Sequence, residues 1–256
     1  MPSHKIAVSA CLALTMLLTH GCSLLSPQPS CPNNIPDIEQ GIAGHSYNGR
    51  PIQYTRIGCG HQTTLVYGAI HGNEPASTTL TEQLIEKLKQ LPGDWRYQHR
   101  VIAIPVANPD GLLANTRANA RGVDPNRNFP SQNRINNRQF GMHPLSEPES
   151  RALVNIKKIY PPDRILSIHQ PLACIDYDGP AIQISRAMAR HTDLPICKLG
   201  ARPGSHGSYA GVERQIPIVT FEMRPEDHHL KPGQIWTRYG RALMAGIVYP
   251  ETPPNL

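Results

Sequence analysis

Several features that define other classes of protein are missing from this 256-residue chain. Its formal net charge is +6, yet Lys and Arg are scattered, and no run of five or more basic residues occurs. This distribution argues against a nucleic-acid-binding surface and indicates a solvated one. The chain also has no internal repeat, which excludes a solenoid or propeller architecture.

A long hydrophobic run is absent as well. The apolar stretch at residues 6–18 is too short to span a bilayer comfortably, but it follows a basic start and precedes small residues. This order predicts a secretory signal at residues 1–22. Cys22 follows Gly21, as a lipidated cysteine would, whereas Thr19 stands where lipoprotein signals usually have an aliphatic residue. A lipid anchor on Cys22, plain cleavage near Gly21 and a retained short anchor all remain open.

Cysteines are few but even in number once the signal is set aside. Two of the six lie in or at the end of the signal, and four remain in the mature body. An even number fits two disulfides formed in an oxidising compartment, so we expect export to the periplasm or cell envelope. Three connectivities are possible, and pairing of near neighbours is one of them; four buried free thiols are the alternative. The four cysteines are Cys31, Cys59, Cys174 and Cys197.

What is present indicates one globular domain. Apolar residues make up 39% and charged residues 17% of the chain, which is ordinary globular composition. Frequent Gly and Pro, 20 and 26 residues, favour a loop-rich enzyme over a helical bundle. Residues 23–43 are rich in Ser, Pro and Asn and are predicted to be a tether. The catalytic domain is predicted at residues 44–256, and the sequence does not indicate its oligomeric state.

Strand-like and helix-like patterns alternate from residue 44 onward. Ser146 and Glu149 have capping-box spacing, and the NPDG segment at 108–111 is typical of a turn. The pattern predicts an α/β fold, with a mostly parallel mixed sheet flanked by helices on both faces. The expected strands are 63–70, 100–107, 164–170 and 216–223, and the expected helices are 76–91, 146–160 and 232–249.

Three of these strands end in polar residues. His71 and Glu74 follow the first, His169 ends the third and Glu222 lies at the end of the fourth. Ligands bind at the carboxyl ends of the strands in open α/β sheets, so these side chains are expected to meet at one rim. Two imidazoles and a carboxylate are the donors of a catalytic zinc site. The alternative is a strand-end histidine bonded to backbone and a first-turn acid favoured by the helix dipole.

Five segments in this order, AIHGNE, NPDG, TRANARGVDPNRNFP, SIHQ and TFEMRP, resemble the zinc carboxypeptidase family from about residue 45 to 248. The resemblance implies that family's fold and a single Zn²⁺ ion. It also implies that His71, Glu74 and His169 are the zinc ligands. Glu222 would then be the general base that takes a proton from the zinc-bound water.

The same resemblance gives roles to the basic segment at 116–130. Arg117 is similar to the arginine that polarises the scissile carbonyl and stabilises its oxyanion. Asn126 and Arg127 are similar to the pair that holds the substrate's terminal carboxylate, which suits a bidentate guanidinium. The alternative for these residues is a solvated basic loop.

Segments 167–181 and 203–222, together with the short chain, resemble the murein peptide amidases of this family. This resemblance implies a peptidoglycan-derived peptide substrate, cut at the γ-D-glutamyl-diaminopimelate amide. A general zinc carboxypeptidase for ordinary peptides is one alternative. A catalytically silent module that binds cell-wall peptides is another.

A loop before the last strand is expected to shape the specificity pocket. Gly207 stands where digestive relatives set the pocket floor, which suggests an open pocket. His206, Ser208 and Arg202 are candidates for contacts with the diaminopimelate side chain. Tyr209 is the nearest counterpart of the family's mobile phenol. The alternative is that this loop is only a flexible turn.

Overall fold

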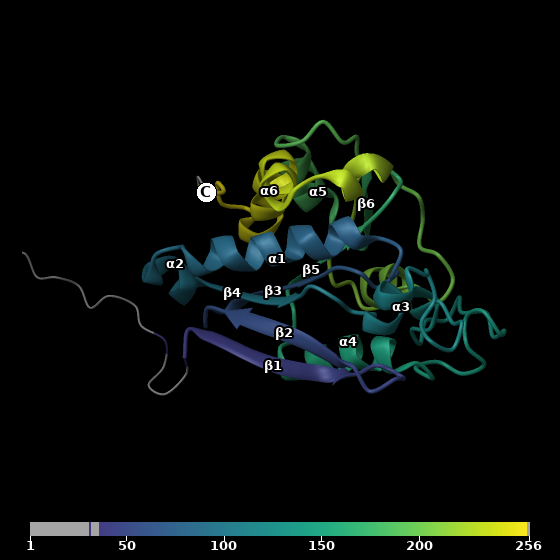
Figure 1. Cartoon of the computed structure of the whole chain (residues 1–256). Helices are drawn as coiled ribbons and strands as arrows, with labels where there is room; N and C mark the ends of the chain where they lie inside the picture. The colour runs from purple at the N-terminus through teal and green to yellow at the C-terminus, as the bar shows by residue number, and fades with distance from the viewer. Residues whose placement is uncertain (1–30, 32–35, 255–256) are drawn as a thin grey trace, which may run out of the picture.

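The computed structural model describes residue 31 and residues 36–254 (Figure 1). The predicted signal segment and Cys22 lie outside the described residues, as does most of the predicted tether. The described chain forms one seven-stranded sheet with helices on both faces. This arrangement confirms the predicted fold class.

The sheet is mixed, with parallel strands in its centre. Its strand order is β1-β2-β4-β3-β5-β7-β6. The four central strands, from β4 to β7, are parallel to one another, and β1, β2 and β6 pair antiparallel at the two edges. The strands are β1 (Ile38–His45), β2 (Pro51–Ile57), β3 (Gln62–Tyr67), β4 (His99–Ile104), β5 (Arg164–His169), β6 (Cys174–Asp178) and β7 (Ile218–Glu222).

Helices cover both faces of the sheet. In Figure 1, α1, α5 and α6 lie on one side of it and α4 on the other. The α-helices are α1 (Pro75–Lys89), α2 (Gly93–Gln98), α3 (Pro109–Ala114), α4 (Pro148–Ile159), α5 (Ile182–Ala189) and α6 (Pro232–Val248). Two short 3₁₀ helices, η1 (Pro125–Arg127) and η3 (Pro225–His229), and a π-helix, η2 (Gly207–Val212), complete the described elements.

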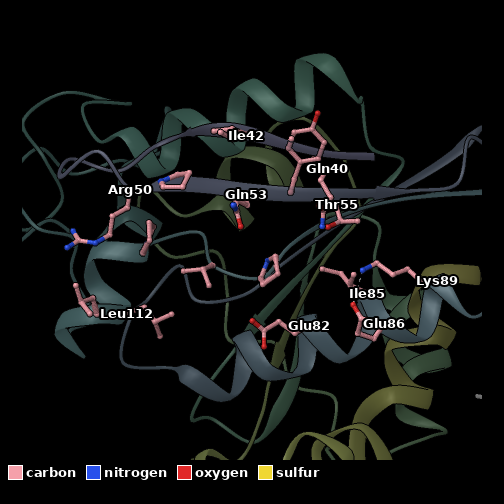
Figure 2. A pocket seen from close by; sticks show the side chains of 17 residues that line it. Gln40, Ile42, Arg50, Gln53, Thr55, Glu82, Ile85, Glu86, Lys89 and Leu112 are labelled. Carbon is pink, nitrogen blue, oxygen red and sulfur yellow. Dashed lines mark hydrogen bonds and ion pairs between the residues drawn. The ribbon is translucent and has the colours of Figure 1, made fainter. Parts of the chain in front are cut away.

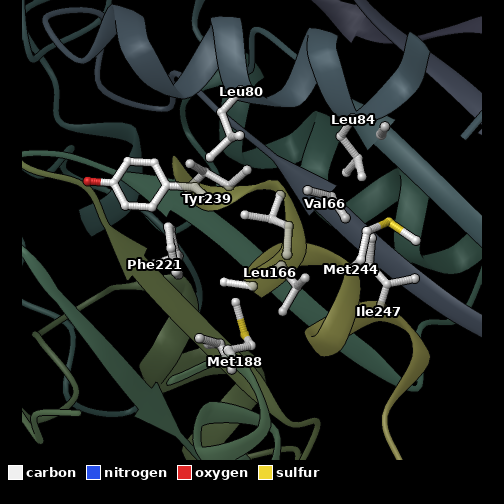
Figure 3. Close-up of a cluster of buried hydrophobic side chains, with 14 of the residues drawn as sticks. Val66, Leu80, Leu84, Leu166, Met188, Phe221, Tyr239, Met244 and Ile247 are labelled. Atoms are coloured by element: carbon white, nitrogen blue, oxygen red, sulfur yellow. The ribbon is translucent and has the colours of Figure 1, made fainter. Parts of the chain in front are cut away.

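Two apolar clusters hold the layers together. Figure 3 shows the first, in which Leu80 and Leu84 of α1 face Val66, Leu166 and the buried residues of α6. The leucines that the sequence spaces at helical intervals on α1 are all buried, so the predicted apolar face of this helix is its core face. The second cluster lies on the opposite face of the sheet, beneath α4.

The amino-terminal edge of the sheet departs from the prediction. Strand β1 begins at Ile38, inside the segment predicted to be a tether, and pairs with β2 along its length. The predicted domain boundary at residue 44 is therefore too late. Neither strand was predicted. The edge strand β1 has no fully buried position and contains two glycines, which weakens its alternating pattern. In β2 the alternation of exposed and buried positions covers only the first half of the strand.

Two local predictions are also corrected. The NPDG segment opens the short helix α3 instead of forming a simple turn, and Asn108 caps it by accepting a hydrogen bond from the Gly111 N–H. Helix α4 has no capping box, because its N-cap is Glu147 and the Ser146 hydroxyl donates to the Glu147 carboxylate instead.

Both disulfides join near neighbours in the sequence. Cys31 is bonded to Cys59, and Cys174 to Cys197. This confirms the nearest-neighbour pairing and excludes the free-thiol alternative. No helix among the described residues is long and apolar enough to cross a membrane.

Candidate active site

The carboxyl ends of β3, β5 and β7 deliver the predicted metal and base residues to one rim. The segment after β3 carries His71 and Glu74 before Pro75 begins α1. His169 ends β5 and Glu222 ends β7, and the strand register places these two residues side by side. All four side chains are at least nine-tenths buried. The structure thus brings the predicted group together.

The Glu74 carboxylate lies between the two imidazoles. Its Oε1 is 2.7 Å from His71 Nδ1, and its Oε2 is 2.9 Å from His169 Nδ1. One ligand atom from each residue lies within 4.8 Å of the others, which is close enough for all three to hold one metal ion. His169 Nε2 is buried without a hydrogen-bond partner.

The negative charge of the carboxylates around this group suits a divalent cation. Burial raises the pKa of Glu74, but His71 and His169 outweigh burial and lower it to about 2. Burial lowers the pKa of His71, whereas Glu74 and Asp124 outweigh it and raise the value to about 8. Buried nitrogen and carboxylate donors that face one point are the donor set of catalytic zinc sites. The residues present therefore fit zinc.

Asp124 is a site residue that the sequence reasoning did not single out. Its Oδ1 lies 3.2 Å from His71 Nε2, and its Oδ2 accepts a hydrogen bond of 2.9 Å from Arg117 Nε. Asp124 thereby directs His71 Nδ1 toward Glu74 and also fixes Arg117. Asp124 lies within the basic segment at 116–130. Its place among arginines that were themselves site candidates could have marked it as a site residue.

The arginines and the amide of the basic segment share a pocket with the metal group. Arg117, Asn126 and Arg127 line the same pocket of about 450 Å³ as His71 and Glu74. The Arg117 side chain is 46% exposed, so it can reach a ligand from the rim. Asn126 belongs to the 3₁₀ turn η1, and its Oδ1 accepts a hydrogen bond from the His206 N–H. The basic segment is thus a wall of the pocket.

Glu222 stands in an environment suited to proton transfer. Burial raises the pKa of its carboxyl, His169 opposes this rise and Glu74 adds to it. One oxygen of Glu222 accepts a long hydrogen bond of 3.4 Å from the Leu172 N–H. A carboxyl whose pKa is displaced toward neutrality can both accept and return a proton.

Comparison with known proteins agrees with this geometry. The zinc carboxypeptidase family model matches residues 32–177, more than half of the chain. The chain belongs to the zinc carboxypeptidase family. It is therefore a hydrolase, which sets aside the alternative of a catalytically silent module.

Relatives within the zinc carboxypeptidases are similar over most of their length. Murein peptide amidase A of Escherichia coli K12 is 32% identical over 201 residues, or 71% of this chain and 80% of that protein. The protein of the same name from Vibrio campbellii is 30% identical over 201 residues, or 71% of this chain and 78% of its own.

Solved structures show the same fold. The murein-tripeptide amidase of Escherichia coli O157 superposes with a TM-score of 0.64 at 24% identity, covering 89% of this chain and 96% of that one. Carboxypeptidase A of Helicoverpa armigera gives a TM-score of 0.67 at 24% identity, covering 82% of this chain and 66% of its own.

The expected specificity loop contributes His206 and Gly207 to the same pocket. Its residues 207–212 form the π-helix η2 and are not a flexible turn. His206 lines the pocket, but its Nδ1 lies 2.8 Å from the Tyr67 hydroxyl and its Nε2 2.9 Å from Lys157 Nζ. Both ring nitrogens are therefore already engaged.

The remaining predicted residues of this loop separate into two groups. Arg202 is exposed and lines the pocket. Ser208 and Tyr209 are buried and do not line it; the Ser208 hydroxyl donates to the Arg202 carbonyl. At Gly207, a Cβ would stand 2.1 Å from Asp178 Oδ2. The small residue thus makes room for a carboxylate of the pocket wall.

A larger cavity of about 1040 Å³ lies between β1, β2 and α1 (Figure 2). Glu82, Glu86 and Lys89 of α1 face Gln53 and Thr55 of β2 across it. None of the predicted site residues lines this cavity. The chemistry of the zinc carboxypeptidases therefore belongs to the smaller pocket at the rim of the sheet.

Proposed function

We propose that this chain is an exported zinc-dependent amidase that hydrolyses the γ-D-glutamyl-diaminopimelate amide of peptidoglycan peptides. The observation that carries the proposal is the convergence of a His-Glu-His group, a buried carboxyl and an arginine-asparagine pair in one pocket. The substrate follows from the murein peptide amidases, which are 30–32% identical to this chain over 201 residues.

In this proposal His71, Glu74 and His169 hold one zinc ion. Bound zinc would polarise the scissile carbonyl and make a water molecule more acidic. Asp124 keeps His71 oriented through the hydrogen bond to its Nε2. The buried carboxylate of Glu74 compensates part of the metal charge in this desolvated rim.

Glu222 is proposed as the general base and acid. Its carboxylate takes a proton from the attacking water and returns it to the nitrogen of the leaving diaminopimelate. Burial raises the pKa of Glu222 above the ordinary carboxyl value, which makes the carboxylate a better proton acceptor. The strand register pairs Glu222 with His169, which supports a proton transfer at the same rim as the proposed metal ligands.

Three residues of the basic segment are proposed to bind the substrate. Arg117, held by Asp124, stabilises the negative charge that develops on the carbonyl oxygen. Arg127 and Asn126 hold the carboxylate next to the bond that is cut. Arg202, exposed at the same pocket, is available to the distal carboxylate of diaminopimelate.

Export is proposed from the two disulfides, which are expected in an oxidising compartment. The lipid anchor on Cys22 is part of this proposal, although Cys22 lies outside the described residues. Mass measurement of the mature amino terminus tests it. A diacylglyceryl adduct on Cys22 supports the anchor, and an unmodified terminus contradicts it.

The substrate proposal is tested with the purified zinc-loaded enzyme. It is incubated with L-alanyl-γ-D-glutamyl-meso-diaminopimelate and, separately, with ordinary peptides that have a free carboxyl terminus. Release of diaminopimelate from the first, with little release from the second, is the expected result. Cleavage of ordinary peptides alone would instead identify a general zinc carboxypeptidase.

A further inference from the structure

A row of polar side chains crosses four strands beneath the proposed catalytic residues. The register places Tyr67 opposite Ser167, Ser167 opposite Thr220, and Thr220 opposite Asp176. Residues that face each other on neighbouring strands point to the same side of the sheet. The row lies two residues before the catalytic ends of β5 and β7, and all four members line the pocket. It forms the polar floor of the pocket.

Ser167 is a buried hydroxyl of this floor. Its side chain is 1% exposed, and it interacts with the hydroxyl of its neighbour Tyr67, which is also bonded to His206 Nδ1. No further hydrogen-bond partner of the Ser167 Oγ lies among the described residues. A serine oxygen has two lone pairs, so Ser167 can still accept a hydrogen bond from a ligand that enters the pocket.

Asp176 is a buried carboxylate that forms no ion pair within the described part of the chain. It is 6% exposed, and its Oδ1 accepts a hydrogen bond of 2.9 Å from the Leu199 N–H. No Lys or Arg of the described chain forms an ion pair with it, because Lys198 Nζ binds Asp178 Oδ1 at 2.6 Å instead. Burial raises the pKa of Asp176 and the charge of Asp178 adds to the rise, whereas the Leu199 and Tyr177 N–H groups and the charge of Lys198 oppose it. A positively charged ligand group would supply the missing charge.

The two ends of the pocket are thus complementary to opposite charges. At the mouth, Arg127 and Asn126 suit a carboxylate. At the floor, Asp176, Thr220 and Ser167 each offer an oxygen that can accept a hydrogen bond. An ammonium group has three N–H donors, which matches three acceptors.

We propose that Asp176, together with the Thr220 and Ser167 hydroxyls, binds the distal ammonium of the substrate's carboxyl-terminal residue. The inference rests on the proposed function, since diaminopimelate carries such an ammonium at the far end of its side chain. Asp176 is a specificity-determining residue. It selects a side chain that ends in an amine and discriminates against one that carries only a distal carboxylate.

Three tripeptides test this inference. Each joins L-alanyl-γ-D-glutamate to a different carboxyl-terminal residue: meso-diaminopimelate, L-lysine, which keeps the distal amine, or L-2-aminopimelate, which lacks it. The wild-type kcat/KM for the two amine-bearing substrates should exceed that for the aminopimelate substrate by about 100-fold, because loss of the amine leaves buried acceptors unpaired.

The variant Asp176→Asn keeps an oxygen for the Leu199 N–H but removes the charge. It should lower kcat/KM about 30- to 100-fold for the two amine-bearing substrates and change it less than about threefold for the aminopimelate substrate. Asp94→Asn, at an exposed carboxylate that does not line the pocket, is the matched control. Any change in the control should be equal for all three substrates. Zinc content and thermal unfolding verify that both variants fold.

An equal loss for all three substrates in Asp176→Asn would make the residue structural and overturn the inference. Calorimetric titration with free meso-diaminopimelate and free L-2-aminopimelate separates this result from failure of the proposed function, because binding requires no turnover. Tighter binding of diaminopimelate that Asp176→Asn abolishes supports the inference even if γ-D-glutamyl peptides are not cut. Equal affinity of the wild type for the two amino acids contradicts it.

Discussion

At the scale of single residues, the site depends on two carboxyls with different roles. Glu222 is buried, and its pKa is raised, whereas Asp124 is bonded to His71 and Arg117, and its pKa is lowered. Desolvation dominates at Glu222, and the neighbouring cations dominate at Asp124. Glu222 is therefore fitted to exchange protons, and Asp124 to remain charged and orient its partners.

The first residue-scale prediction concerns Glu222. Glu222→Gln should preserve the fold and bind zinc normally but lower kcat by about 10²–10⁴-fold, because the proton acceptor is lost. Steady-state kinetics and metal analysis of the purified variant provide the measurement. Turnover close to the wild-type rate would remove Glu222 from the role of base.

The second residue-scale prediction concerns Asp124. Asp124→Asn removes the negative charge that fixes the tautomer of His71, so zinc affinity should fall about 10- to 100-fold. Competition with a chelator of known affinity measures the change. Asp94→Asn, on the exposed surface, is the control and should bind zinc as the wild type does. Unchanged affinity in Asp124→Asn would show that His71 is oriented without it.

At the scale of elements, α4 places a lysine under the pocket wall. Lys157 Nζ lies 2.9 Å from His206 Nε2 and 4.4 Å from the centre of the Tyr209 ring. Burial, together with the charge of Arg214, lowers the pKa of Lys157 to about 7. Because the unfolded chain keeps this proton to higher pH, Lys157 opposes folding most strongly below pH 7. This opposition decreases as pH rises from about 7 toward the ordinary lysine value.

The free energy of unfolding should therefore rise with pH more steeply in the wild type than in Lys157→Met. One proton corresponds to a slope difference of at most about 1.4 kcal/mol per pH unit between pH 7 and 10. Urea unfolding at several pH values measures it. Lys158→Met, an exposed neighbour on the same helix, should retain the wild-type slope. Equal slopes in wild type and Lys157→Met would contradict the burial argument.

At the scale of the whole molecule, disulfides tie loops of the chain to the sheet. The bond between Cys174 and Cys197 spans 23 residues and connects β6, which carries Asp176, to the segment after α5. The double variant Cys174→Ala, Cys197→Ala should lose about 2–4 kcal/mol of stability, since the unfolded chain gains conformational freedom. Denaturant unfolding of the oxidised protein and the double variant measures the loss. Equal midpoints would show that this disulfide does not stabilise the fold.

The sequence predicted much of the sheet because its central strands are long apolar runs. It predicted α1 from leucines at helical spacing, and His71, Glu74, His169 and Glu222 from their places at strand ends. It did not predict β1 and β2, whose residues are only partly buried or weakly patterned. The capping box at α4 was wrong, because the helix begins one residue later than predicted, with Glu147 as its N-cap, and the Ser146 hydroxyl donates to the carboxylate of that residue.

The sequence by itself determined the order of the motifs, the alternation of strands and helices along the chain, and the residue types of the metal site. Those properties are local, since they depend on periodicity and on side chains close together in the chain. Only the tertiary structure decided which polar residues share the pocket. Asp124 meets His71 across 53 positions, and Asp176 joins Thr220 through antiparallel register. Such neighbours are set by strand register and layer packing, which join residues with no common local pattern.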